Sequence, residues 1–263
     1  DVDGDGDADL VIANNGANTL LLNDGLGNFR SSPWDAVGGS RVTKALALGD
    51  VNGDGTLDLI LANQIGSTGV NQLFINNGSG IFVSSHFPGS SVLTNALALG
   101  DFNGDGALDL VVGNSGLDEL FINNGSGTFS KTLIFVGDST STTTAVQLGD
   151  VDGDGALDIV FGKNSAEGIG GAEVLLGDGA GGFRPQLLQR GSTARTNAVS
   201  LGDVNGDGRL DIIVARAEAA NDLYLNGGTT TGFTRTVLPG GNGTTTALAL
   251  GDVDGDGDLD LIS

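Results

Sequence analysis

The sequence predicts an all-β fold, a β-propeller of four-stranded antiparallel blades, from three observations. Acidic nine-residue loops recur at intervals of 49, 51, 49, 53 and 49 residues, beginning at Asp1, Asp50, Asp101, Asp150, Asp203 and Asp252, and a period of about fifty residues indicates an array or a propeller. Each complete unit holds four strand-like segments. No long window shows a helical apolar period, and 47 glycines punctuate the turns. Such sheets pack radially into a propeller.

The four strands of a unit are assigned from the residues around each loop. The segment Ala45–Leu48 alternates small and large residues, as a strand does when one face has little room. The turn Asn76–Gly80 contains the Asn-Gly pair of a tight hairpin. It follows a third strand at Leu73–Ile75. Continuous apolar runs after the loops predict second strands buried on both faces, at Leu10–Ile12, Leu59–Ala62, Leu110–Val112, Ile159–Phe161 and Ile212–Val214. Aromatic residues open the outer strands and are expected to pack between units, at Phe29, Phe82, Phe129, Phe183 and Phe233.

Residues 1–263 are expected to form a single propeller segment of five blades and a partial sixth. Residues 252–263 repeat the register of residues 1–12, so a closed five-bladed ring has no place for the last loop. The chain also opens inside a repeat unit. We therefore expect it to be a segment of a longer protein, in which roughly two further units complete a seven-bladed propeller.

The composition restricts the partners of the protein. It has 33 Asp and Glu against 11 Lys and Arg, with a formal net charge of -22, which disfavours nucleic acid and anionic membrane surfaces and favours cations. A hydrophobic fraction of 39% is enough for a packed core. The absence of cysteine excludes disulfides and thiolate metal sites. There is no long apolar span for membrane insertion.

The acidic loops predict calcium sites, up to six Ca²⁺ ions at one per loop. Counted from the first Asp, positions 1, 3, 5 and 9 carry side-chain oxygens in every copy, and calcium takes about six to eight oxygen ligands. Glycine at position 6 allows the turn that returns position 9 to the ion. Position 7 varies too much for a side-chain ligand, so its backbone carbonyl is the expected donor. The predicted ligands are Asp1, Asp3, Asp5, Asp7 and Asp9; Asp50, Asn52, Asp54, Thr56 and Asp58; Asp101, Asn103, Asp105, Ala107 and Asp109; Asp150, Asp152, Asp154, Ala156 and Asp158; Asp203, Asn205, Asp207, Arg209 and Asp211; and Asp252, Asp254, Asp256, Asp258 and Asp260.

The alternative to a metal site is a set of solvated Asp-Gly turns. Six loops in register oppose it, because they hold 23 of the 33 acidic residues and such crowded carboxylates repel one another without a cation. Magnesium is the competing ion, but it prefers strict octahedral geometry and keeps its waters. An EF-hand is excluded because position 12 carries no glutamate. Asp at position 3 in the first, fourth and sixth loops, against Asn elsewhere, predicts unequal affinities. Leucine at position 8 predicts an apolar plug beneath most loops.

The pattern D-x-[DN]-x-D-G-x-x-D, followed by an apolar strand and by N-[ND]-G-x-G-x-F, resembles the FG-GAP or VCBS repeats, found in integrin alpha chains. The second motif occurs at Asn23–Phe29, Asn76–Phe82 and Asn123–Phe129, and the fourth unit departs from it at Gly177–Gly179. The resemblance implies calcium loops between the first two strands of propeller blades, in extracellular or cell-surface proteins that bind proteins or glycans. The literal Phe-Gly and Gly-Ala-Pro motifs of integrins are absent, so an integrin-specific role does not follow.

Three functions remain open. The first is a non-enzymatic extracellular scaffold that binds a protein partner at the cell surface or in the matrix. The second is a glycan-binding propeller, but Trp34 and Tyr224 belong to no repeated aromatic constellation. The third is the propeller of a polysaccharide lyase, but His86 is the sole histidine and the cations are scattered. The sequence therefore predicts a protein that is not an enzyme.

Three sequons raise the question of glycosylation. They begin at Asn77, Asn124 and Asn242. Chance alone gives a similar number at this composition, but the first two sequons lie in predicted hairpin turns, where a glycan would be carried on the surface.

Overall fold

The computed structural model of the chain describes residues 1–32, 41–88, 92–133, 140–165, 170–186, 188, 194–228 and 232–263. These residues form strands and turns and contain no helix, so none that could cross a membrane. Two compact units are present. The first comprises the described parts of Asp1–Asp101, Asp105–Asn114 and Glu119–Leu133, and the second those of Phe102–Gly104, Ser115–Asp118 and Ile134–Ser263.

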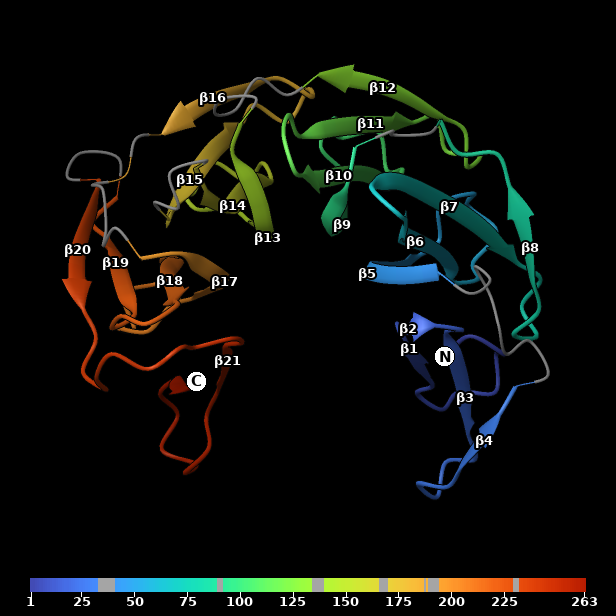
Figure 1. Cartoon of the computed structure of the whole chain (residues 1–263), viewed down its shortest axis with the longest axis horizontal. Helices are drawn as coiled ribbons and strands as arrows, with labels where there is room; N and C mark the ends of the chain where they lie inside the picture. Colours follow the sequence, from blue (N-terminus) through green and yellow to red (C-terminus); the bar gives the residue numbers. More distant parts are fainter. Residues whose placement is uncertain are drawn as a thin grey trace. The chain divides into compact units, whose positions relative to one another are not determined.

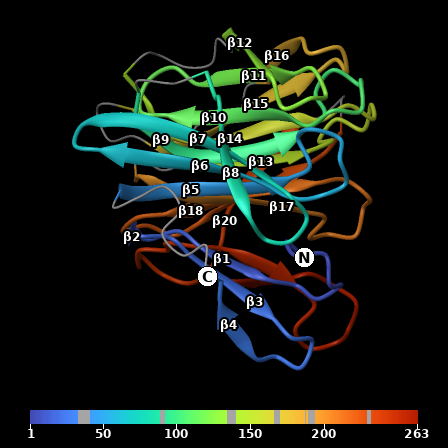
Figure 2. The same ribbon diagram turned by 90° about the vertical axis from the view of Figure 1, so that its right-hand side faces the viewer.

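Unit 1 holds blades 1 to 3 (Figure 1). Blade 1 has the strand order β1-β3-β4, and the short β2 between β1 and β3 pairs with β5 at the edge of blade 2. Blade 2 continues β5-β6-β7-β8, and the antiparallel pairing of β5, β6 and β7 is visible in Figure 2. Blade 3 is β9-β10-β11-β12. The bounds are β1 Leu10–Ile12, β2 Asn15–Gly16, β3 Thr19–Asn23, β4 Phe29–Ser31, β5 Arg41–Gly49, β6 Asp58–Ile65, β7 Thr68–Asn76, β8 Phe82–Ser85, β9 Thr94–Gly100, β10 Asp109–Asn114, β11 Glu119–Asn123 and β12 Phe129–Leu133.

Unit 2 holds blades 4 and 5 and a partial blade 6. Both complete blades are four-stranded and antiparallel, with the orders β13-β14-β15-β16 and β17-β18-β19-β20, and β21 pairs with β22. The bounds are β13 Thr142–Gly149, β14 Asp158–Asn164, β15 Gly170–Gly177, β16 Phe183–Gln186, β17 Thr196–Gly202, β18 Asp211–Arg216, β19 Asp222–Asn226, β20 Phe233–Val237, β21 Ala249–Gly251 and β22 Asp260–Ile262. The predicted all-β propeller of four-stranded antiparallel blades is confirmed: blades 2 to 5 have four strands of their own, blade 1 has the three strands β1-β3-β4, and the partial sixth blade has two.

The second strand is the centre of each complete blade, as the continuous apolar runs predicted. Every described residue of β10, β14 and β18 is buried, because both faces of an inner strand are covered when sheets stack. In blade 1, β1 is only half-buried, since no strand pairs with its second edge among the described residues. The outer aromatics differ likewise: Phe82 and Phe129 are buried, whereas Phe29 is 49% exposed.

In loops 1 to 4 the residue at position 2 is the main apolar anchor, whereas Val204 in loop 5 is only partly buried and Val253 in loop 6 is 65% exposed. Val2, Val51, Phe102 and Val151 are at most 3% exposed. The predicted leucine plug at position 8 is only partly buried in blades 2 to 5. Position 2 takes the deeper place because its side chain joins the core clusters, as Val51 does with Ile60 and Leu110.

A buried polar residue occurs near the far end of each complete second strand, away from the loop. Asn63, Asn114, Lys163 and Arg216 occupy equivalent places, five residues after position 9 of the loop. Asn63 Oδ1 accepts a hydrogen bond from Thr43 Oγ1, on the neighbouring strand β5, at 2.6 Å. Lys163 Nζ instead lies 2.6 Å from Asp118 Oδ2, in the turn that precedes β11. Apolar packing and a satisfied polar layer thus alternate along the blade.

Candidate metal centre

The six acidic loops connect the first and second strands of their blades, and in blade 1 the loop precedes β1. Each turns at two glycines. The position-6 glycines have φ between 83° and 96°, a left-handed conformation that a side chain would strain. The predicted sharp turn at position 6 is therefore present in every loop.

The carboxylates at positions 1 and 5 hold the turn together. In all six loops the backbone N–H of the position-6 glycine donates to the position-1 Asp, at 2.7–3.0 Å. In all six the N–H of position 7 donates to Oδ1 of the position-5 Asp, at 2.8–3.0 Å. Backbone amides thus orient these oxygens in one place, and each carboxylate keeps lone pairs for a cation.

The position-9 aspartates tie the loop to its blade. Asp58 accepts the N–H of Val51 at 3.1 Å through Oδ2 and that of Asn76 at 2.9 Å through Oδ1. The same two bonds recur at Asp9, Asp158 and Asp211. This role was not predicted, and it leaves lone pairs on both oxygens for the ion.

The pKa shifts of the loop carboxylates have opposite directions at buried and exposed positions. Burial raises the pKa of Asp58, Asp158 and Asp211, with neighbouring loop carboxylates adding to the rise and the two amide donors opposing it. The hydroxyl of Thr56 lowers the pKa of the exposed Asp54. The Gly208 N–H lowers the pKa of Asp203. The position-9 carboxylates are therefore the ones whose charge most needs a cation.

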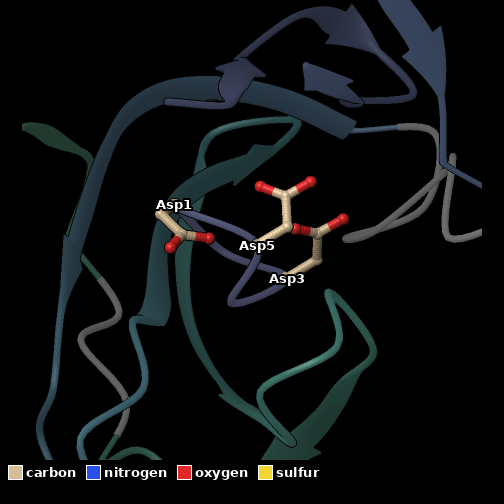
Figure 3. A group of neighbouring side chains, drawn as sticks. All are labelled: Asp1, Asp3 and Asp5. Carbon is tan, nitrogen blue, oxygen red and sulfur yellow. The ribbon is translucent and has the colours of Figure 1, made fainter. Parts of the chain in front are cut away.

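Three loops bring three carboxylates together with oxygens within 4.8 Å of one another. The groups are Asp1, Asp3 and Asp5; Asp150, Asp152 and Asp158; and Asp252, Asp254 and Asp260. They belong to the loops with Asp at position 3, because the other loops offer an amide there. Figure 3 shows the first group rising from one short turn. The position-7 carbonyls stay a prediction.

One oxygen of the first group, Asp3 Oδ1, is placed where a bound cation would satisfy it. Asp3 Oδ1 is buried and has no hydrogen-bond partner among the described residues. A buried carboxylate oxygen without a donor is costly, and a bound divalent cation would satisfy it. The donor set is made only of carboxylate, amide and carbonyl oxygens, which suits a hard ion. The residues therefore fit calcium at this loop.

Arginines lie beside three loops. Arg30 Nη2 is 3.8 Å from Asp3 Oδ2, and Arg184 Nη2 is 2.8 Å from Asp152 Oδ2. Both follow the aromatic that opens the fourth strand, and both accompany Asp at position 3. In loop 5, Arg209 at position 7 places Nη2 3.0 Å from Asp207 Oδ2 and donates through Nε to Asn226 O. In loop 5 the guanidinium of Arg209 thus supplies a positive charge beside the loop carboxylates.

Replacing Arg209 by alanine is expected to strengthen calcium binding at loop 5 about two- to fivefold, because a half-exposed pair of this kind contributes no more than about 1 kcal/mol. The amide resonance of Gly208, followed during a calcium titration, measures this loop alone. Lys44→Ala is the matched control, since it removes the same charge from β5 outside the loops. Equal affinities for R209A and the unaltered protein would contradict competition by the guanidinium.

An asparagine at the end of the third strand joins neighbouring blades, a role that sequence reasoning missed. Asn76 Nδ2 donates to the position-2 carbonyl of the preceding loop, Val2 O, at 2.7 Å and to Leu57 O of its own loop at 3.1 Å. Asn123 and Asn226 make the equivalent pairs of bonds, to Val51 and Leu108 and to Val151 and Leu210. The repeated Asn of the N-[ND]-G motif was the available signal. We call Asn76, Asn123 and Asn226 the bridging asparagines.

Other candidate residues are less favourably placed. Tyr224 is 1% exposed within the core of blade 5 and cannot stack on a sugar. His86 is exposed, and Trp34 lies outside the described residues. A pocket beside loop 4, lined in part by Asp152, Arg184 and Phe233, has a volume of about 130 Å³, below the roughly 300–1,000 Å³ of ligand pockets. The sequon residues Asn77, Asn124 and Asn242 are exposed.

The chain is similar to a family of repeats and to solved structures. The crystal structure of BBS1N in complex with ARL6DN, soaked with lead, matches with a TM-score of 0.58 and 15% identity, over 96% of this chain and 71% of that chain. No curated protein matches. The model of the FG-GAP-like repeat matches residues 1–61, 50–112, 101–161 and 203–263. The gap at residues 162–202 contains Gly177, where the fourth unit departs from the motif. The chain therefore belongs to the FG-GAP-like repeat family.

Proposed function

We propose that the chain is a calcium-binding, non-enzymatic module that acts outside the cell or at its surface and binds a protein partner. The observation that carries the calcium proposal is the Asp1, Asp3 and Asp5 group with the buried, unpartnered Asp3 Oδ1. Positions 1, 3, 5 and 9 would hold the ion through side chains and position 7 through its carbonyl. The ion would supply positive charge and cross-link the loop.

The extracellular setting and the protein partner are supported less directly than calcium binding. Calcium sites of extracellular modules bind with Kd values of about 10⁻⁴–10⁻³ M, and the exposed loops of this chain suit that range. The similar solved structure is a complex of two proteins, BBS1N with ARL6DN. A non-enzymatic role is favoured because the sole histidine is exposed and Arg209, Arg216 and Arg235 are held in ion pairs. Connecting loops at the blade rims are the surface that we assign to the partner.

Calorimetric titration of the chelator-treated protein tests the calcium proposal. We expect saturable binding of up to six ions, with the loops that carry Asp at position 3 among the tighter sites. Asp54→Asn in loop 2 is expected to remove one site and leave the others. Magnesium at equal concentration serves as the competing ion and should bind more weakly. Absence of saturable binding up to about 10 mM calcium, ten times the weakest Kd expected, would reject the proposal.

A further inference from the structure

The bridging asparagines complete a continuous line of hydrogen bonds between neighbouring acidic loops. In unit 1, Asp9 Oδ2 accepts the N–H of Val2 at 2.8 Å, and the carbonyl of Val2 accepts Nδ2 of Asn76 at 2.7 Å. The N–H of Asn76 then donates to Asp58 Oδ1 at 2.9 Å. One residue, Asn76, therefore touches loop 1 through its side chain and the position-9 carboxylate of loop 2 through its backbone.

The line continues through blade 3. Asp58 Oδ2 accepts the N–H of Val51, whose carbonyl accepts Nδ2 of Asn123 at 2.7 Å, and the N–H of Asn123 donates to Asp109 Oδ1 at 2.8 Å. The two oxygens of Asp58 thus accept hydrogen bonds from different places. One accepts the position-2 N–H of its own loop, and the other accepts the backbone N–H of the bridging asparagine, whose side chain contacts the preceding loop. In unit 2 the same steps lead from Asp158 through Val151 and Asn226 to Asp211.

Blade 4 lacks this link. Gly177 stands where the other complete blades have the bridging asparagine, and its N–H still donates to Asp158 Oδ1 at 2.8 Å. It has no side chain to reach the carbonyl of Phe102, which is position 2 of loop 3. That carbonyl accepts the N–H of Gly181 at 2.9 Å. The blade therefore forms without an asparagine at this place.

We propose that the bridging asparagines couple calcium binding at neighbouring loops, so that an ion in one loop raises the affinity of the next. This inference rests on the proposed calcium-binding function. An ion that orders loop 1 fixes the backbone at Val2, and Asn76 then holds Asp58 in the position that loop 2 needs for its own ion. Because loop 2 is then already partly ordered, binding of the second ion costs less conformational entropy. This gives positive coupling between the two sites without any large movement. Coupling of this kind is reciprocal between the two sites.

A double-mutant cycle with site-resolved titration tests the coupling. Asp5→Asn disables loop 1, and the amide resonance of Gly55 reports calcium affinity at loop 2. We expect Asp5→Asn to weaken loop 2 about fivefold or more, and to have no effect on loop 2 when Asn76→Gly is also present. Asn76→Gly reproduces the residue that blade 4 carries and leaves every ligand charge unchanged. The reciprocal change, Asp54→Asn, should weaken loop 1 by the same factor, read at Gly6.

Asn77→Gly is the matched control, because the side chain of Asn77 is exposed and accepts the N–H of Ser79 within its own turn. Coupling should survive in this variant. Amide hydrogen exchange supplies a second readout: with loop 2 disabled, calcium in loop 1 should slow exchange at Val51, and Asn76→Gly should abolish that protection. Asn123→Gly repeats the test between loops 2 and 3.

The outcomes separate the two proposals. Calcium-dependent shifts at Gly6 and Gly55 with an Asp5→Asn effect that Asn76→Gly leaves intact would overturn the coupling and leave the calcium function standing. Independent sites in the unaltered protein would do the same. No shift at any loop glycine would reject the calcium function and the coupling together.

Discussion

Removal of calcium is expected to lower the melting temperature of the protein by roughly 10–20 °C. An ion present at 100 times its Kd stabilises the native state by about 2.7 kcal/mol, and each kcal/mol moves the melting temperature by about 2–4 °C in a domain of this size. Two tightly bound ions are enough for the expected shift. Differential scanning calorimetry with and without chelator measures it.

Refilling the chelated protein provides the control. Calcium should restore the melting temperature, and magnesium at the same concentration should restore less of it. A melting temperature that is unchanged by chelator would show that the loops do not need a bound ion. Lower pH should reduce the calcium effect, because ligands must be deprotonated to bind metal.

The pH dependence of the metal-free protein has a definite sign. Burial raises the folded-state pKa of Asp58, Asp158 and Asp211 above the ordinary value of 3.8, so the folded protein binds these protons more tightly than the unfolded chain does. Their contribution to stability is fully present below pH 3.8 and is lost as the pH rises through the raised values. These three groups should therefore lower the stability of the chelated protein as the pH rises above about 4, while the calcium-loaded protein gains from metal binding over the same range.

Loss of Asp222 is expected to destabilise unit 2 by about 3–5 kcal/mol, because it leaves a buried guanidinium without its partner. Arg216 and Asp222 are fully buried, and Arg216 Nε donates to Asp222 Oδ2 at 2.9 Å while Arg235 Nη2 donates to Oδ1 at 2.7 Å. Arg216 Nη1 also donates to Thr196 Oγ1 at 2.9 Å. Urea denaturation of Asp222→Ala at fixed calcium concentration measures the change.

Two comparisons make this expectation specific. The double variant Arg216→Met with Asp222→Leu should recover much of the loss, since apolar residues of similar volume can replace a buried pair. Arg184→Ala, which breaks the exposed pair with Asp152, should cost less than about 1 kcal/mol. A loss at Asp222→Ala no larger than that at Arg184→Ala would show that the buried pair contributes little.

The fold was predictable because its signals are local and repeated. Continuous apolar runs located the second strand of blades 1 to 5, and the Asn-Gly pair of Asn76–Gly80 located the hairpin between β7 and β8, since backbone conformation at these places follows from residue type. The loop turn was predictable for the same reason, through Gly55 and its counterparts. The predicted leucine plug was the weaker part, because the relative depth of Val51 and Leu57 depends on packing against the next blade rather than on hydrophobicity.

The features that the sequence did not predict depend on the register between strands, which brings residues that are far apart in sequence into contact. Asn76 lies at a hairpin turn, where asparagine is common for conformational reasons, so its motif alone does not reveal that Nδ2 reaches Val2. Arg216, Asp222 and Arg235 are scattered in sequence and meet only through the pairing of β18, β19 and β20. Tyr224, left open as a sugar platform, is placed in the core by the same pairing.

The bridging asparagines also bear on how such a chain can change in length. The bond made by each bridging asparagine runs from its side chain to a main-chain carbonyl, as from Asn123 to Val51, so this bond does not depend on which side chain occupies position 2. A complete unit with its own asparagine and its own loop carries both halves of this contact. Gene duplication or deletion of such a unit would therefore join new neighbours without any further substitution, whereas a copy of blade 4, with Gly177, would carry its interruption to each new place in the array.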